Sequence, residues 1–323
     1  RVWHRYNDFV KLHHALVQSA GAGVDARLAV PGKRFFGNRN PAFVAKLHAA
    51  LVLGIRDYVK KSGLDRIVVA VSGGIDSAVV TALAVDAVGP ERVHGLALPG
   101  PFSSEGSIAD AVTLADNLGI NLDIQPITDL VDTVMQQTQS VSWFANPNGM
   151  VEENVQARIR GVLSMAYANQ QPGTVVLATG NKSELAVGYC TAYGDMCGGF
   201  SLLKDVPKTL VFSLCKWRNS IDQIIPPTII TRPPSAELKP NQKDSDSLPS
   251  YDILDPILEL YIEKNMSLKN IINRGHDENI VKFVINNVEK NEYKRRQTPP
   301  GVKITPLSFD RDRRMPIANK YLS

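Results

Sequence analysis

The residues with the clearest chemical potential follow a predicted strand early in the chain. An apolar, β-branched run at 67–71 ends in the sequence SGGIDS at 72–77, and a helix-compatible segment continues to residue 88. A strand, a glycine turn and a helix N-terminus place backbone N–H groups and the positive end of the helix dipole around a bound anion. The pattern predicts a phosphate-binding loop.

The polar side chains of this loop limit which ligands it could bind. Ser72 and Ser77 add hydroxyl donors. The carboxylate of Asp76 would repel a phosphate, unless it holds a divalent cation that bridges to the phosphates. The simpler alternative is a plain turn with Asp76 as a helix cap, and Gly-Gly alone would favour that alternative. The sequence is not a Walker loop, because no Gly-Lys-Ser/Thr follows.

A second carboxylate, Glu184, lies one helical turn past another predicted strand, at 174–178. Ligands of parallel sheets bind beyond the carboxyl ends of the strands. Asp76 and Glu184 would therefore make a reasonable Mg²⁺ site once substrate phosphates complete the oxygen shell. A single glutamate here could instead be a helix-start carboxylate favoured by the helix dipole, and only the pairing favours the metal.

These clusters must be positioned by an alternation of strands and helices. Such alternation predicts a doubly wound parallel sheet with helices on both faces. The stretch at 225–250, rich in Pro, Ser, Lys and Asp, predicts a mobile loop that could close over the site. Strands are predicted at 67–71, 93–98, 122–127 and 174–178, and helices at 47–61, 77–88, 107–118, 129–137, 151–169, 253–264, 268–273 and 278–288.

The composition and the cysteine content predict a soluble, cytoplasmic protein. The chain has 323 residues, of which 44% are hydrophobic and 21% charged, and no run is apolar enough to span a bilayer. Its net charge of +4 is too mild to argue for nucleic acid. Cys190, Cys197 and Cys215 lack zinc-like spacing, and a sparse, odd set fits a reducing compartment.

The SGGIDS loop resembles the pyrophosphate-binding loop of the ATP pyrophosphatase (adenine nucleotide α-hydrolase-like) superfamily, whose members adenylate a substrate and release pyrophosphate. Further strings make the chain from about residue 48 similar to the NAD synthetase family, in the form whose synthetase domain follows a glutaminase domain. This resemblance implies a Rossmann-like fold. The strings are EENVQARIR at 152–160, TGNKSE at 179–184, KDVPK at 204–208, RPPSAEL at 232–238 and EYKRRQ at 292–297.

The resemblance implies roles for the matched residues. It makes Asp76 and Glu184 the Mg²⁺ ligands and, with Lys208, the catalytic set. Arg158 and Arg160 lie two residues apart on one helix and cannot point the same way, so one of them is structural. The implied ATP contacts are Ser72, Gly73, Gly74, Ile75, Asp76, Ser77, Thr179, Lys208 and Ser235, and the implied deamido-NAD contacts are Asn154, Arg158, Glu184 and Lys294.

Two positions depart from the family pattern. Ala192 stands where the smaller ammonia-dependent enzymes have a lysine. The segment Gln242-Lys243-Asp244-Ser245 stands where the family has Gln-x-Asp-Glu, so a loop carboxylate is expected to be missing.

The implied reaction is the amidation of deamido-NAD to NAD through an adenylate, with ATP and Mg²⁺, by a homodimer. Nitrogen would come from ammonia, or from glutamine through a separate or missing glutaminase domain. The loop motif leaves open another adenylating ligase, such as GMP synthetase. A phosphoinositide-recruited, catalytically impaired binding protein is a further alternative.

The last alternative rests on the N-terminal residues. Residues 1–46 resemble the second part of a PX domain, which implies lipid-phosphate contacts at Arg5, Tyr6 and Lys33. Half a domain cannot bury its core, so a phosphoinositide membrane is expected as a partner only if that module is complete. The synthetase-like domain is predicted at 47–323.

Overall fold

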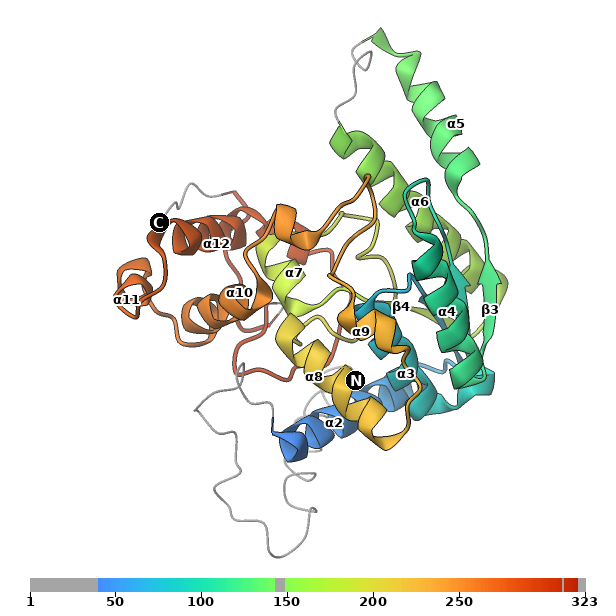
Figure 1. Cartoon of the computed structure of the whole chain (residues 1–323), viewed down its shortest axis with the longest axis horizontal. Helices are drawn as coiled ribbons and strands as arrows, with labels where there is room; N and C mark the ends of the chain where they lie inside the picture. The colour runs from blue at the N-terminus through green and yellow to red at the C-terminus, as the bar shows by residue number, and fades with distance from the viewer. Residues whose placement is uncertain (1–39, 143–148, 310, 319–323) are drawn as a thin grey trace, which may run out of the picture. The chain divides into compact units, whose positions relative to one another are not determined.

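Among the described residues, five parallel strands form one sheet in the computed structural model, in the order β3-β2-β1-β4-β5 (Figure 1). The structure describes residues 40–142, 149–309 and 311–318, and the predicted lipid contacts Arg5, Tyr6 and Lys33 lie outside them. The strands are β1 (Arg66–Ala70), β2 (Val93–Ala97), β3 (Asn121–Ile124), β4 (Thr174–Ala178) and β5 (Phe200–Ser201).

The strand order reverses between β1 and β4. The chain builds outward from β1 to β2 and β3, and then returns to place β4 on the other side of β1. Val69 of β1 pairs with Leu177 of β4, so the two strands end at nearly the same level. Loops that leave such a reversal in opposite directions open a crevice between them. The predicted doubly wound α/β fold is confirmed.

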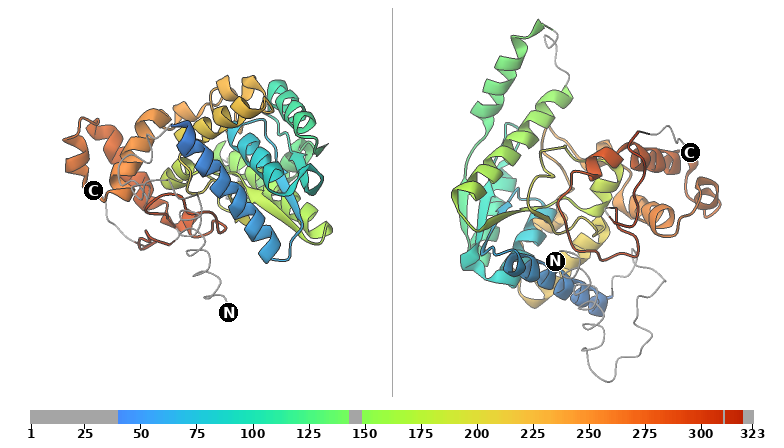
Figure 2. Two further views of the ribbon diagram at one scale, coloured as in Figure 1. Left: turned by 90° about the horizontal axis from the view of Figure 1, so that it is seen from below. Right: turned by 180° about the vertical axis from the view of Figure 1, so that it is seen from behind.

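Helices cover both faces of the sheet (Figure 2). Successive side chains of β1 point to opposite faces, and the central three are buried, so both faces need cover. On one face, Val68 packs with Leu96 and Val176 under the predominantly apolar sides of α5 (Thr128–Gln139) and α6 (Gly149–Gln170). The other face carries α3 (Ile75–Val88) and α4 (Glu105–Leu118), with α2 (Pro41–Lys61) and α8 (Lys208–Ile221) packed against α3.

A group of shorter helices follows β4 and gathers on the side of the sheet away from β3 (Figure 1). The helix predicted at 253–264 starts at Tyr251 and turns into a π-helix beyond Pro256, which lacks the N–H that a regular ladder needs. The remaining elements are α7 (Lys182–Val187), α9 (Pro227–Thr231), α10 (Tyr251–Leu258), the π-helix η5 (Glu259–Glu263), α11 (Leu268–Ile272), α12 (Glu278–Lys290), α13 (Glu292–Arg295) and the short 3₁₀ turns η2 (Pro90–Arg92) and η4 (Asp244–Asp246).

Two predicted boundaries differ from the structure by three residues or more. The strand predicted at 122–127 ends at Ile124, because the chain then leaves the sheet edge to start α5. The helix predicted from Leu47 begins at Pro41, where the Asn40 side chain accepts a hydrogen bond from the Ala42 N–H at 2.9 Å. The predicted division at residues 46 and 47 thus falls inside α2. In the described ranges, no helix has the length and apolar character needed to cross a membrane.

One carboxylate, that of Asp86, links the helices α2, α3 and α8. Asp86 of α3 accepts hydrogen bonds from Arg218 of α8 at 2.8 and 3.0 Å, and it lies 2.8 Å from the Nε2 atom of His48 on α2. Burial alone would raise the pKa of Asp86, but His48 and Arg218 lower it below its ordinary value. The ionised carboxylate therefore stabilises the contact between α2, α3 and α8.

We expect Asp86→Ala to lower the free energy of unfolding by about 2–3 kcal/mol, because it leaves a largely buried arginine without its partner. Asp57→Ala removes an exposed pair with Lys61 and should cost less than about 0.5 kcal/mol. Urea denaturation of both variants measures the difference. Equal losses would show that Asp86 does not join the helices.

Candidate active site

A cavity of about 490 Å³ opens at the carboxyl ends of β1, β2 and β4. It lies at the strand-order reversal, as the sequence predicts. Two predicted site residues, Ser77 and Arg158, are not part of its wall. The predicted residues that do line it are Ser72, Gly73, Gly74, Ile75, Asp76, Asn154, Thr179, Glu184, Lys208, Ser235 and Lys294.

The loop after β1 is built from glycine geometry and serine hydroxyls. Gly73 has a φ of 78°, and a Cβ atom there would lie 2.2 Å from the carbonyl oxygen of Ser107. Only glycine fits that position. Gly74 is the N-cap of α3, so the first free N–H groups of this helix lie at the cavity.

Ser77 supports the loop from inside. It is 3% exposed, its hydroxyl accepts from the Ser72 N–H at 3.2 Å, and it donates to the Gly74 carbonyl at 3.0 Å. The sequence assigned this hydroxyl to ATP phosphates. In the structure Ser77 instead shapes the turn that presents Ser72 and the glycines.

The helix after β4 aligns the second carboxylate with the first. Asn181 and Glu184 form a capping box: the Asn181 side chain accepts from the Glu184 N–H at 3.0 Å, and the Asn181 N–H donates to Glu184 Oε2 at 3.3 Å. The Asn181 amide also donates to Asp76 Oδ1 at 2.9 Å. Asp76 and Glu184 are therefore held at adjacent strand ends, as predicted.

Lys208, the first residue of α8, lies between these two carboxylates. Its Nζ atom donates to Asp76 Oδ2 and, at 3.0 Å, to Glu184 Oε1. The start of α8 is fixed by Asp255 of α10, which accepts from the N–H and the hydroxyl of Thr209. The predicted catalytic set of Asp76, Glu184 and Lys208 thus forms one cluster.

The cluster carries an excess of negative charge. Asp244 is buried, lines the cavity and accepts a hydrogen bond from the Tyr251 hydroxyl at 2.6 Å. Burial raises the pKa of Glu184 to about 8; the charge of Lys208 opposes the rise, and Asp76 and Asp244 add to it. With all three carboxylates ionised, the Lys208 ammonium would leave a net negative charge, which a proton on Glu184 or a further cation would offset.

Helix α6 carries three residues with predicted or possible substrate contacts: Asn154, Arg158 and Arg160. Asn154 Oδ1 accepts from the Thr191 hydroxyl at 2.9 Å and lines the cavity. Arg158 is exposed and donates to the Ala192 carbonyl outside the cavity wall. Arg160 lines the cavity and donates to the Leu98 carbonyl at 2.9 Å, and burial lowers its pKa to about 10. Of the two arginines, Arg160 lines the cavity and Arg158 does not, and the substrate role predicted for Arg158 stays a prediction.

The segment after α9 covers the cavity and is fastened to the start of α4. Glu237 accepts hydrogen bonds from the Ser104 N–H at 3.2 Å and from the hydroxyls of Ser104 and Ser107 at 2.9 and 2.7 Å. Arg232 donates to Ser107 Oγ at 3.0 Å and pairs with Asp110 of α4. We call residues 232–246 the covering loop.

Comparison with known proteins identifies two family models along the chain. The NAD synthase model matches residues 47–298, and the PX domain model matches residues 1–62. The chain belongs to the NAD synthase family.

Individual relatives of the NAD synthase family agree with this assignment. The chain is 51% identical over 276 residues to a glutamine-dependent NAD(+) synthetase of Synechocystis, covering 85% of this chain and 49% of the relative. A glutamine-dependent NAD+ synthetase of Acinetobacter baumannii, solved with ADP, shares 46% identity at a TM-score of 0.57. The aligned part covers 85% of this chain and 50% of that one.

A third relative is nearly matched in full. The NH3-dependent NAD synthetase of Campylobacter jejuni, solved with nitrate, shares 27% identity at a TM-score of 0.63, over 78% of this chain and 95% of that one. The chain therefore spans about half the length of the glutamine-dependent relatives and nearly all of an ammonia-dependent one.

The structure also bears on the departures from the NAD synthase pattern. Ser245, where the family carries an acid, is exposed, whereas Asp244 beside it supplies a carboxylate to the cavity. Asp244 matches the aspartate of the family motif in the sequence. Only the fold of the covering loop shows that its side chain lines the cavity. Glu237 was missed because its partners, Ser104 and Ser107, lie about 130 residues earlier in the chain.

We expect Glu237→Ala to detach the covering loop from α4. Hydrogen exchange of the amides at 233–246 should accelerate at least about tenfold, because three hydrogen bonds that hold the segment are lost. Lys239→Ala changes an exposed residue of the same segment and serves as the control. Unchanged exchange in Glu237→Ala would mean that other contacts hold the loop.

Proposed function

We propose that this chain amidates deamido-NAD to NAD, using ATP and ammonia and releasing AMP and pyrophosphate. The carboxylate of the nicotinate ring attacks the α-phosphorus of ATP, and the bond to pyrophosphate breaks. Ammonia then attacks the activated carbonyl carbon, AMP leaves and a proton is lost. AMP is a far better leaving group than an oxide ion, which explains why the carboxylate is activated first.

One observation carries the proposal: in a member of the NAD synthase family, the SGGIDS loop, Glu184 and Lys208 converge on one cavity at the strand-order reversal. A glycine turn at a helix N-terminus suits phosphate, and the paired carboxylates suit a cation. The ADP complex of the Acinetobacter relative supports an adenine nucleotide as the ligand.

The chain's own groups supply positioning and charge neutralisation, and no nucleophilic side chain is needed. The N–H groups of Gly73 and Gly74 and the Lys208 ammonium would bind the phosphates, with Thr179 and Ser235 nearby in the cavity wall. Further along the cavity, Asn154, Arg160 and Lys294 would face the dinucleotide substrate.

The residues present fit a Mg²⁺ ion. Asp76 and Glu184 already converge on a single cation, the Lys208 ammonium, and Asp244 adds uncompensated charge. Among the described residues, no group of three or more His, Cys, Asp or Glu side chains could hold a metal alone. Two carboxylates plus substrate oxygens are the usual magnesium ligands. When bound, the ion would withdraw charge from the phosphates and orient them.

The proposal has two further parts, a homodimer and a cytoplasmic location, and the source of nitrogen is to be tested. Nitrogen would come from ammonia or from glutamine, and the test reactions below distinguish the two. The PX match at 1–62 keeps a phosphoinositide membrane as a candidate partner, but its predicted contacts lie outside the described residues.

Pyrophosphate release tests the reaction. The protein is incubated with ATP, Mg²⁺ and deamido-NAD, with ammonium chloride and glutamine in separate reactions, and XMP replaces deamido-NAD in a parallel one. We expect pyrophosphate, AMP and NAD with deamido-NAD and ammonia. Release that depends on XMP instead would establish the alternative ligase.

We expect Asp76→Ala to lower pyrophosphate release at least about 1,000-fold, because it removes one of the two carboxylates that would hold the metal. Asp129→Ala, an exposed carboxylate on α5, should leave the rate within about twofold of wild type. Near-normal turnover of the Asp76 variant would refute the metal role.

The two arginines of α6 give a second comparison. We expect Arg160→Met to lower kcat/KM about 100-fold and Arg158→Met less than about threefold, because only Arg160 lines the cavity. Thermal melting checks that both variants are folded. A larger loss in Arg158→Met would restore that residue as the substrate contact.

A further inference from the structure

The helix that carries Glu184 is too short to be stable without help. α7 has six residues, and isolated helices shorter than about 12 residues are marginal in water. Five of its residues, Lys182, Ser183, Leu185, Ala186 and Val187, are buried. Its last carbonyl groups therefore need partners from the protein, because an unpaired buried carbonyl is costly.

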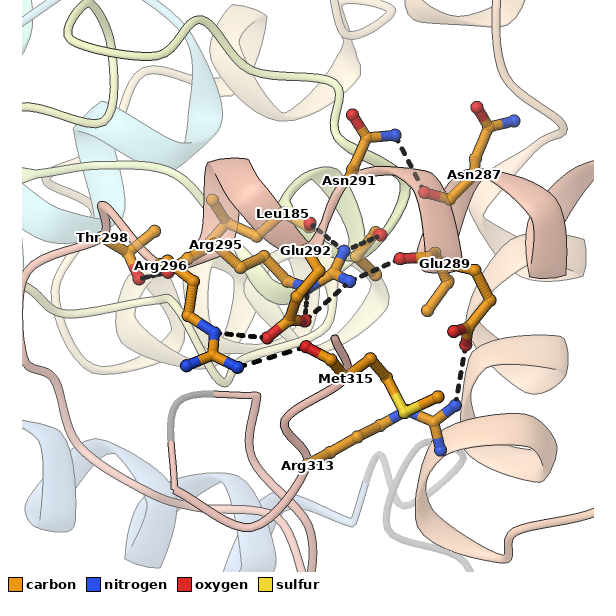
Figure 3. A network of polar contacts seen from close by, with 12 residues as sticks. Leu185, Asn287, Glu289, Asn291, Glu292, Arg295, Arg296, Thr298, Arg313 and Met315 are labelled. Atoms are coloured by element: carbon orange, nitrogen blue, oxygen red, sulfur yellow. Dashed lines mark hydrogen bonds and ion pairs between the residues drawn. The ribbon is translucent and has the colours of Figure 1, made fainter. Parts of the chain in front are cut away.

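Side chains from one short segment supply these partners, and Figure 3 shows the contact between Arg295 and Leu185. Arg295 Nη1 donates to the Ala186 carbonyl at 2.7 Å and more weakly to the Leu185 carbonyl at 3.4 Å. Asn291 Nδ2 donates to the Val187 carbonyl at 3.0 Å. Carbonyls of successive residues at the end of α7 are thus satisfied from residues 291–295, which we call the α7 cap.

Lys294, also part of the α7 cap, binds the carbonyl groups that follow α7. Its Nζ atom donates to the carbonyls of Gly188 and Cys190 at 2.7 and 2.8 Å. Gly188 has a φ of 74°, and a Cβ atom there would lie 2.0 Å from Asn291. The left-handed turn after α7 and the close approach of the cap therefore need the same glycine.

Arg295 is the fixed member of the α7 cap. It is 4% exposed, pairs with Glu292 at 3.1 Å and donates to the Val288 carbonyl. Its guanidinium lies 4.6 Å from the centre of the Phe309 ring. A cation at the C-terminal end of a helix also complements the helix dipole. Arg295 thus connects α12 and the C-terminal segment to α7.

We propose that Arg295 is a positioning residue for Glu184, acting through α7. Glu184 points its carboxylate at the cation only while the capping box with Asn181 is formed, and that box needs α7 to be helical. Among the described residues, Arg295 makes no hydrogen bond or ion pair with Lys208 or Asp76. Its effect must therefore be transmitted by the helix. The catalytic consequence rests on the proposed function, whereas the structural coupling does not.

Arg295→Lys tests the proposal, with Arg296→Met as the matched control. Lysine keeps the charge but cannot contact Ala186, Val288 and Glu292 together. Arg296 shares Glu292 as a partner, at 2.6 Å, and donates to the Met315 carbonyl, but within the described residues it makes no hydrogen bond or ion pair with α7. Both variants alter the ion pairs of Glu292, whereas only Arg295→Lys alters a hydrogen bond to α7.

In Arg295→Lys we expect the amides of 184–190 to exchange at least about tenfold faster, with the urea midpoint close to that of Arg296→Met. We expect kcat to fall about 10- to 100-fold at a KM for ATP within about threefold of wild type, because Glu184 is displaced while the phosphate loop is intact. Arg296→Met should leave both readouts within about twofold of wild type.

Unchanged exchange at 184–190 in folded Arg295→Lys would overturn the proposal, as would equal effects in the two variants. If wild type itself releases no pyrophosphate, the proposed function fails, and the exchange data still decide whether Arg295 holds α7. If Arg295→Lys does not fold, Asn291→Ala takes its place. It removes only the Val187 contact from α7 and should accelerate exchange at 185–190 at least about threefold.

Discussion

The structure of the site depends on one ammonium group shared by carboxylates from different strand ends. Lys208 holds Asp76 and Glu184 together, and Asp244 lies near enough to raise the pKa of Glu184 further. Such a cluster would repel itself without a cation, so its assembly requires elements that resist the repulsion. Most of the surrounding hydrogen bonds serve that purpose: the Asn181 amide fixes Asp76, and the Asp255 carboxylate fixes the start of α8.

The fold adds a second source of positive potential. Helices α3, α7 and α8 are among those that begin at the cavity, each directly after a strand end or a tight turn. The partial positive charge of their first N–H groups offsets part of the acid cluster and favours an anionic ligand beside it. The same edge of the sheet can therefore attract a cation and a phosphate, which are the two charged parts of a metal-bound nucleotide.

The sequence predicted the fold and the centre of the site because their signals are local. The β-branched run before SGGIDS and the strand before Glu184 are each recognisable alone, and parallel strands bring their carboxyl ends together. Arg160 could not be chosen over Arg158 from spacing, since helix geometry separates the two without saying which side faces the cavity. Glu237 and Arg295 were beyond reach because their partners are more than 100 residues away in the chain.

Helix α2 also limits how the two family matches can coexist. Both family models match residues 47–62. In this range α2 packs against α3 and α8, and its buried side chains include Leu47, Leu51, Ile55 and Val59. An amphipathic helix has a single apolar stripe, and a stripe that is occupied cannot also close the core of a lipid-binding module. The apolar side of α2 is thus fully accounted for by the described part of the chain.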